Sequence, residues 1–135
     1  MVERLSLVVV GAHLRGQPLN HELTDLGGEF IAERRTAAAY AMYALDGAVP
    51  KPGLVRVGGN AGSAFVVEVW SMPRDRFGEF IERVAAPLCI GRIELDDGSA
   101  PLGFLCESHA ATSARDISGF SGWRAYLTGP ESRGV

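Results

Sequence analysis

The sequence predicts an α+β domain built on a small mixed, barrel-like sheet with a few short helices. Strand-like apolar runs outnumber helical patterns along the chain, and the helical patterns are short and set apart from the strands. The chain has only 135 residues. So many strands in so small a domain leave exposed edges unless the sheet curls or closes, which favours a barrel-like arrangement.

The first third of the chain predicts a strand, a loop and a short helix before two further strands. Residues 5–10 form a continuous apolar run that ends at Gly11, which is typical of a fully buried strand. Residues 11–19 contain two glycines and a proline and indicate a loop. Asn20 is expected to cap a short helix that ends at the glycine pair 27–28. Strands are then expected over residues 29–36 and 40–45.

The middle of the chain predicts a rigid turn, a hairpin and a helix. Residues 50–53 combine two prolines with a glycine and indicate a turn. A short strand over 54–57 and a strong strand over 64–72 flank a glycine-rich stretch and are expected to form a hairpin. Pro73 is tolerated in the first turn of a helix. The apolar face of that helix is expected to hold Phe77, Phe80, Ile81 and Val84.

The last third predicts a second hairpin and an interrupted helix. Apolar runs over 88–95 and 102–106 flank an Asp-Gly turn. Residues 116–127 place aromatic and leucine side chains at helical spacing, although two glycines interrupt them. One domain is expected over residues 1–128, followed by a flexible polar tail over 129–135.

Composition excludes several classes of function. Thirteen Lys and Arg against sixteen Asp and Glu give a net charge of −3, which argues against a nucleic-acid binder and a polybasic membrane anchor. The early apolar run is too short to span a bilayer and lacks a signal-peptide cleavage region. Cys89 and Cys106 are too few for a disulfide scaffold and are expected to be small buried side chains. A cytoplasmic protein is the default expectation.

The loop after the first strand is the strongest candidate site. Gly11 and Ala12 carry little side chain, so the N–H groups from Gly11 to Leu14 could form a nest for an anion. His13 can transfer a proton near neutral pH, and Arg15 can hold a carboxylate through two hydrogen bonds. The alternative is a tight turn that carries a surface histidine.

The remaining histidines do not indicate a metal site. His21 and His109 are expected to be solvated, no two histidines stand at metal-ligand spacing, and there is no CxxC motif. The sequence also lacks the GxSxG and GxGxxG motifs, so covalent acyl transfer is not supported and no cofactor is implied.

A second set of candidates lies on the predicted strands. Glu68 stands between valines, so it faces either solvent, which is the favoured interpretation, or a cavity in which burial would raise its pKa. Glu107 has the same ambiguity. Arg34 and Arg35 end a strand and are more often solvated there, although one could bind a carboxylate. Tyr40 and the tyrosine three positions later lie on opposite faces, so at most one lines a pocket.

Several motifs occur in an order that resembles one known family. They are Val9-Val-Gly-Ala-His-Leu-x-Gly-x-Pro-Leu-Asn20, Arg35-Thr36, Tyr40, Tyr43, Lys51-Pro-Gly-Leu54, Glu68-Val-Trp70, Ala86-Pro-Leu-x-Ile-Gly91 and Gly103-Phe-Leu-Cys-Glu107. Together they resemble the C-terminal domain of allophanate hydrolase, from about residue 5 to residue 126.

The resemblance implies a γ-glutamylcyclotransferase-like fold, a small mixed barrel with short helices. In cyclotransferases the loop after the first strand binds a substrate carboxylate, and the matching stretch here is residues 10–14. The catalytic glutamate of cyclotransferases aligns with Val84, two residues from Glu82. Cyclisation of γ-glutamyl compounds, with Glu68 or Glu82 as the base, is therefore the weakest functional interpretation.

The resemblance also implies a reaction. In allophanate hydrolases an amidase domain cleaves allophanate, and the C-terminal domain decarboxylates an N-carboxylated urea product with the help of a histidine, which corresponds to His13. This sequence contains no amidase domain, so the resemblance implies either a stand-alone partner or paralogue of an amidase, or a domain excised from a longer protein. The alternative is a non-catalytic module that binds a small carboxylate or holds an amidase.

A homodimer is the first expectation if the aromatic residues form an exposed patch. The expected substrate-binding residues are Gly11, Ala12, Leu14, Arg15, Asn20, Arg35, Tyr40 and Glu68.

Overall fold

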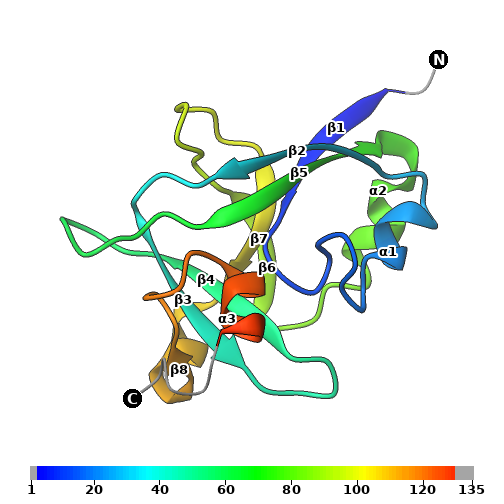
Figure 1. Ribbon diagram of the computed structural model, residues 1–135. Coiled ribbons are helices and arrows are strands. Elements are labelled where there is room, and N and C mark those ends of the chain that lie inside the picture. The colour runs from blue at the N-terminus through cyan, green and yellow to red at the C-terminus, as the bar shows by residue number, and fades with distance from the viewer. Residues whose placement is uncertain (1–2, 130–135) are drawn as a thin grey trace.

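A computed structural model describes residues 3–129 of the chain (Figure 1). Short helices flank two sheets in this part of the chain. The elements are β1 (Arg4–Val9), α1 (His21–Thr24), β2 (Glu29–Arg35), β3 (Tyr40–Leu45), β4 (Lys51–Arg56), β5 (Val66–Pro73), α2 (Arg74–Ile81), β6 (Leu88–Arg92), β7 (Leu102–Cys106), the 3-10 helix η1 (Ser108–Ser113), β8 (Arg115–Asp116) and α3 (Trp123–Thr128).

The larger sheet has the order β2-β5-β1-β7-β6, and the smaller sheet has the order β4-β3-β8. Strands β1 and β7 run parallel, whereas all other neighbouring pairs are antiparallel. The apolar run at the start of the sequence is therefore the central strand of the larger sheet. Since β1 is buried between two neighbours, the chain that leaves its C-terminal end enters the interior of the molecule (Figure 1).

The mixed α+β class is confirmed, but a closed barrel is not. The two outer strands of the larger sheet approach each other only at one end, just beyond β2 and β6. There the Ala37 N–H donates to the Glu94 carbonyl at 2.9 Å, and the Asp96 N–H donates to the Arg35 carbonyl at 3.0 Å. The larger sheet is therefore strongly curled, with a short bridge between its edges.

The predicted hairpin between the fourth and fifth strands is wrong. Strand β4 pairs with β3 in the small sheet, whereas β5 pairs with β1 and β2 in the large one. The glycine-rich stretch between them therefore passes from one sheet to the other. The predicted turn over residues 50–53 is also wrong for most of its length, because Lys51 already starts β4. Pro52 is tolerated in β4 because β4 is an edge strand.

Two predicted helices are shorter than expected. Helix α2 ends at Ile81, so Val84 lies beyond it, and Ile81 itself is exposed while Phe80 is buried. Near the C-terminus only Trp123–Thr128 is helical, and Gly122 stands at the N-cap of that helix. The hairpin of β6 and β7 is confirmed. Residues 130–135 of the predicted flexible tail lie outside the described residues.

The core of the described residues is almost entirely apolar. His13, Thr36 and Glu68 are the polar or charged side chains buried within residues 3–129. No helix in this range has the length and apolar character needed to cross a bilayer. No three His, Cys, Asp or Glu side chains of the described chain converge as metal ligands. A buried polar group without a hydrogen-bond partner destabilises the fold, so the buried side chains of His13 and Glu68 need interactions that apolar packing does not supply.

Candidate functional site

The loop that follows β1, residues 10–20, folds back on itself; we call it the His13 loop. The Leu14 N–H donates to the Gly11 carbonyl at 2.9 Å, and the Leu19 N–H donates to the Ala12 carbonyl at 2.8 Å. The side-chain amide of Asn20 donates to the His13 carbonyl at 2.8 Å. These bonds tie both ends of the loop together and fix the backbone of His13.

The ring of His13 is buried between aromatic side chains and a carboxylate. It stacks on Phe104 at a centroid distance of 4.8 Å and meets the edge of Phe80 at 5.4 Å. Its Nε2 lies 2.8 Å from Oε1 of Glu22, which belongs to α1. The other ring nitrogen, Nδ1, has no hydrogen-bond partner among residues 3–129. The surface-histidine alternative therefore does not describe this side chain, which is 7% exposed.

Burial lowers the pKa of His13 below its ordinary value of 6.5. The hydrogen bond and negative charge of Glu22 oppose this effect, whereas Lys51 and His21 add to it. Desolvation is the largest cause because the charged imidazolium loses its water shell inside the core. The ring of the unliganded protein is therefore neutral at pH 7.

A small cavity and a larger cleft lie next to His13. The cavity has a volume of about 10 Å³, which is room for a single water molecule. The cleft beside it has about 340 Å³ and shares Lys51 and Leu88 with the cavity. Glu22 lines the cleft, so the pair of His13 and Glu22 spans the two spaces. Residues 45–49 and 85–88 form much of the cleft wall.

Three backbone amides at the cavity are not used within the described chain. The N–H groups of Gly11, Ala12 and His13 donate to no acceptor among residues 3–129, although all three residues line the cavity. The next two amides are engaged, because Leu14 bonds within the loop and Arg15 bonds to Glu68. The predicted anion nest is thus reduced to three consecutive N–H groups.

Gly11 is required for packing, in addition to the backbone access that its sequence position suggests. A Cβ atom at Gly11 would lie 2.0 Å from Cδ of Pro52 and 3.4 Å from Cδ1 of Trp123. Strand β4 therefore fills the space above this glycine, although the sequence suggested that a ligand could approach the backbone there. The close approach brings Lys51, the neighbour of Pro52, to the cavity.

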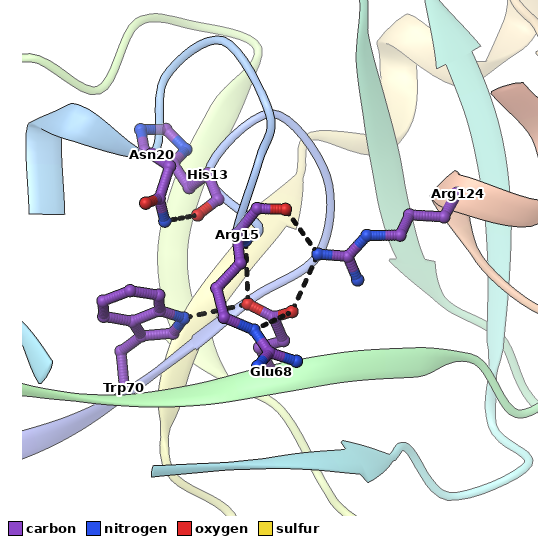
Figure 2. Close-up of polar contacts among 6 residues, drawn as sticks. All are labelled: His13, Arg15, Asn20, Glu68, Trp70 and Arg124. Atoms are coloured by element: carbon purple, nitrogen blue, oxygen red, sulfur yellow. Dashed lines mark hydrogen bonds and ion pairs between the residues drawn. The ribbon is translucent and has the colours of Figure 1, made fainter. Parts of the chain in front are cut away.

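Glu68 points into the protein, where it is saturated with donors (Figure 2). Its carboxylate accepts hydrogen bonds from the Arg15 N–H at 3.0 Å, Arg15 Nε at 3.1 Å, Trp70 Nε1 at 3.1 Å and Arg124 Nη2 at 2.9 Å. Burial raises the pKa of Glu68, but these hydrogen bonds outweigh burial and lower the pKa below its usual value. The favoured solvent-facing interpretation is wrong, and the carboxylate stays ionised.

The other predicted site residues do not gather at the cleft. Arg15 turns toward Glu68, and its guanidinium lies 3.6 Å above the Phe30 ring. Arg35 is exposed at the end of β2. Tyr40 is buried, and its hydroxyl accepts a hydrogen bond from the Glu94 N–H at 2.8 Å. Leu14 is buried and does not line the cavity or the cleft. Asn20 makes no capping bond, because its side chain bonds to the loop instead.

Three residues of the arrangement are absent from the sequence-based predictions. Glu22 and Lys51 line the cleft, and Arg124 completes the shell around Glu68. Lys51 stands in a motif that carries the family resemblance, which is a usable signal. Glu22 and Arg124 have no local signal, since their contacts depend on how distant segments meet.

Comparison with known proteins identifies relatives of this domain. The family model described as allophanate hydrolase C-terminal domain matches residues 5–128. Urea amidolyase of Lachancea kluyveri is 40% identical over 129 residues, which cover 93% of this chain and 7% of that protein. Urea amidolyase of Saccharomyces cerevisiae is 41% identical over 127 residues, covering 91% of this chain and 7% of that protein. The chain thus spans a small part of the curated relatives.

Solved structures give the same picture. An allophanate hydrolase from Kluyveromyces lactis superposes with a TM-score of 0.91 at 40% identity, covering 94% of this chain and 21% of that chain. An Escherichia coli protein described as specific to uropathogenic strains has a TM-score of 0.86 at 33% identity, covering 96% and 99% of the two chains. A γ-glutamyl cyclotransferase reaches a TM-score of 0.57 at 9% identity, over 84% of this chain and 70% of that chain, and shares the fold alone.

Proposed function

Because this chain belongs to the family of allophanate hydrolase C-terminal domains, tied to urea and allophanate metabolism, we propose that it decarboxylates an N-carboxylated urea-type molecule. In this proposal His13 is the proton donor. The carboxylate is held by the backbone N–H groups of the His13 loop and by Lys51. No metal or organic cofactor takes part in the proposed step.

The proposed chemistry is simple to balance. The substrate has the form R–NH–COO⁻, and one proton is added to its nitrogen. The bond between that nitrogen and the carboxylate carbon then breaks, and its electron pair stays on nitrogen. The products are R–NH₂ and CO₂, so each turnover consumes one proton. A site for this reaction needs an acid close to the nitrogen and donors that orient the anion.

The observation that carries the proposal is the pair formed by the buried His13 ring and the partly exposed Glu22 carboxylate at the cleft. With Glu22 as a carboxylate, the hydrogen on Nε2 points to it, and Nδ1 is the nitrogen that can take up a second proton. The ring is neutral without a ligand because burial lowers its pKa. A bound anion would raise that pKa by its negative charge. In this proposal His13 therefore takes up its second proton when the substrate binds.

The cleft supplies the remaining groups. Lys51 lines both the cavity and the cleft, so its ammonium can reach an anion beside His13. The three unused amides at residues 11–13 offer N–H donors at the same place. The cavity holds about one water molecule, so the body of a substrate lies in the 340 Å³ cleft.

The size of the relatives bears on the partner. This chain covers only 7% of the urea amidolyases and 21% of the K. lactis allophanate hydrolase. We assign no allophanate hydrolysis to this domain by itself. We propose that an amidase supplies its substrate.

The test measures CO₂ release from freshly prepared 1,3-dicarboxyurea. Proton uptake, recorded in a stopped-flow instrument, monitors the reaction. We expect the wild-type protein to exceed the spontaneous rate and His13→Gln to return to that rate. His109→Gln is the matched control, because His109 is exposed on η1 and should leave turnover unchanged. Equal rates for the wild-type protein and for buffer would reject the decarboxylase.

A non-catalytic module is the second candidate, and the tightness of the cavity favours it. Such a module would bind a small carboxylate, or an amidase, without turnover. Calorimetric titration of the wild-type protein with malonate, a stable dicarboxylate, distinguishes the two candidates when read beside the CO₂ assay. Binding that needs Lys51, with no acceleration of CO₂ release, would favour the module.

A further inference from the structure

The C-terminal helix α3 contacts the backbone of the His13 loop. Arg124 of α3 donates through Nη2 to the Arg15 carbonyl at 2.6 Å and to Oε2 of Glu68 at 2.9 Å. One guanidinium therefore joins the loop, strand β5 and helix α3 (Figure 2). The bond to a backbone carbonyl matters here, because it fixes the course of the loop and not merely a side chain.

Glu68, which also accepts a hydrogen bond from Arg124, is fixed in the core of the protein. Its side chain is 0% exposed, and it sits in β5 opposite Val9, the last residue of β1. It also binds the loop directly, through both the N–H and the side chain of Arg15. Because a buried carboxylate without partners is very unfavourable, Glu68 strongly favours the conformation in which all its donors are present.

The same helix packs on the start of the loop. Trp123 lies 3.4 Å from the position that a Gly11 Cβ would occupy, so the indole and Pro52 together leave no room for movement there. The contacts of α3 thus bracket His13, with Gly11 two residues before it and Arg15 two residues after it. Asn20 and Glu22 hold the histidine from the side of α1.

Neither Glu68 nor Arg124 lines the cavity or the cleft. Figure 2 shows the His13 ring turned away from the Glu68 carboxylate. Any influence of these two residues on the reaction must therefore pass through the backbone of the loop. This separation makes their role different from that of Glu22, which touches the ring itself.

We propose that Arg124 and Glu68 are positioning residues, which hold the His13 loop so that the ring stays buried beside Glu22 and the three amides stay at the cavity. The proposal rests on the proposed function for its effect on turnover. Its effect on His13 itself does not depend on any substrate. Displacement of a reacting group by about 1 Å can reduce a rate by about 100-fold.

The test compares Arg124→Met and Arg124→Lys with the wild-type protein. Met removes the guanidinium and keeps an unbranched stem of four atoms, and Lys restores the charge on a single nitrogen with three N–H donors. Arg83→Met is the matched control, since Arg83 is exposed after α2 and, within residues 3–129, forms a hydrogen bond through its backbone N–H alone. NMR titration of the His13 ring is the first measurement, and kcat and KM on 1,3-dicarboxyurea are the second.

We expect Arg124→Met to raise the pKa of His13 toward 6.5, because a loosened loop admits water to the ring. The charged groups that act on the ring, Glu22, Lys51 and His21, are unchanged in this variant. We also expect kcat to fall at least tenfold with KM nearly constant, and Arg124→Lys to recover part of both effects. Arg83→Met should match the wild-type protein in each measurement.

An unchanged His13 titration in folded Arg124→Met would overturn the proposal, even if the variant melted at a lower temperature. If Arg124→Met does not fold, Arg124→Lys decides the matter, because the lysine side chain is one atom shorter than arginine. Its nitrogen therefore falls short of the position from which Nη2 contacts both acceptors, and the histidine must still shift. If the wild-type protein shows no turnover, the proposed function fails while the NMR comparison still decides whether Arg124 positions His13.

Discussion

Two carboxylates, Glu22 and Glu68, hold the His13 loop, and they are bonded in different ways. Glu22 makes one hydrogen bond to the His13 ring and borders the open cleft. Glu68 accepts four hydrogen bonds, two of its donors being guanidinium groups, and its side chain is fully buried. The carboxylate of Glu22 is partly exposed at the cleft, whereas that of Glu68 is enclosed by its donors and has no contact with solvent.

This contrast teaches that burial alone does not identify an acid or a base. Desolvation tends to raise the pKa of Glu68, yet the surrounding donors bring it below its usual value. His13 has a single polar partner on its ring, so desolvation dominates and its pKa falls. The number of partners thus decides which buried group can change its protonation state near neutral pH.

The largest expected effect is on stability, when Glu68→Gln is compared with Glu22→Gln. Glu68→Gln removes the negative charge between two arginines and should lower the unfolding free energy by about 3 kcal/mol. Glu22→Gln weakens one hydrogen bond to a neutral ring and should cost about 1 kcal/mol. Urea denaturation at pH 7.5 measures both. Equal losses would mean that the two carboxylates do not differ as described.

The next effect concerns the packing of the loop against β4. Gly11→Ala places a methyl group 2.0 Å from Cδ of Pro52, and neither the ring nor the strand can yield easily. We expect a loss of about 2 kcal/mol, measured by the same denaturation curves. Gly16→Ala is the control within the loop: Gly16 has open space around it, so only its φ of 81° opposes alanine, at about 1 kcal/mol. A milder effect at Gly11 than at Gly16 would contradict this packing.

The pH dependence of stability sharpens the description of His13. Its pKa is lowered in the folded protein, so the unfolded chain, with a pKa near 6.5, binds more protons between the two values. Its contribution to stability is complete above pH 6.5 and is lost as the pH falls through the folded pKa. Glu22→Gln removes two influences that raise this pKa, so the loss should extend to lower pH.

Denaturation at pH 7.5, 6.5 and 5.5 checks this expectation. The difference between the wild-type protein and His13→Gln isolates the histidine, because the other groups titrate in both proteins. A wild-type curve parallel to that of His13→Gln over this range would show that the ring keeps an ordinary pKa.

The smallest expected effect is on substrate binding. Lys51→Met removes the cation shared by the cavity and the cleft, and it should raise KM for 1,3-dicarboxyurea about fivefold while kcat changes little. The wild-type KM should also rise with added salt, and the KM of Lys51→Met should rise less. Lys51 is the sole lysine in the sequence, so the exposed Arg83→Met serves as the charge control. A similar KM in all three proteins would exclude Lys51 from the anion site.

Much of the fold could be predicted from local sequence patterns. The strand over residues 5–10 and the hairpin of 88–95 with 102–106 are confirmed because each is specified by a nearby apolar run and turn. The pairing of β4 with β5 is wrong because the same glycine-rich stretch suits a hairpin tip and a passage between two sheets. A short connection does not by itself determine which strands pair.

The sequence predicted only the part of the site that lies within a single motif. The glycine, alanine and histidine that follow β1 do lie together at the cavity. Glu22 reaches His13 from nine positions away because the loop folds back, and no periodicity encodes that fold. Arg124 is 109 positions from Arg15, so only the assembled core brings them together. The orientation of Glu68 depends on those same donors, which explains why the valines around it left both faces open.

The Arg124 contact also determines where this domain can be divided from a longer polypeptide. A fragment that stops before α3 would keep every residue that lines the cavity and the cleft, yet it would lack the guanidinium that binds the Arg15 carbonyl. The matched family region ends at residue 128, so it includes this helix. For domain exchange or fusion among relatives, α3 should therefore travel with the His13 loop as one unit, and a junction placed after it preserves the site.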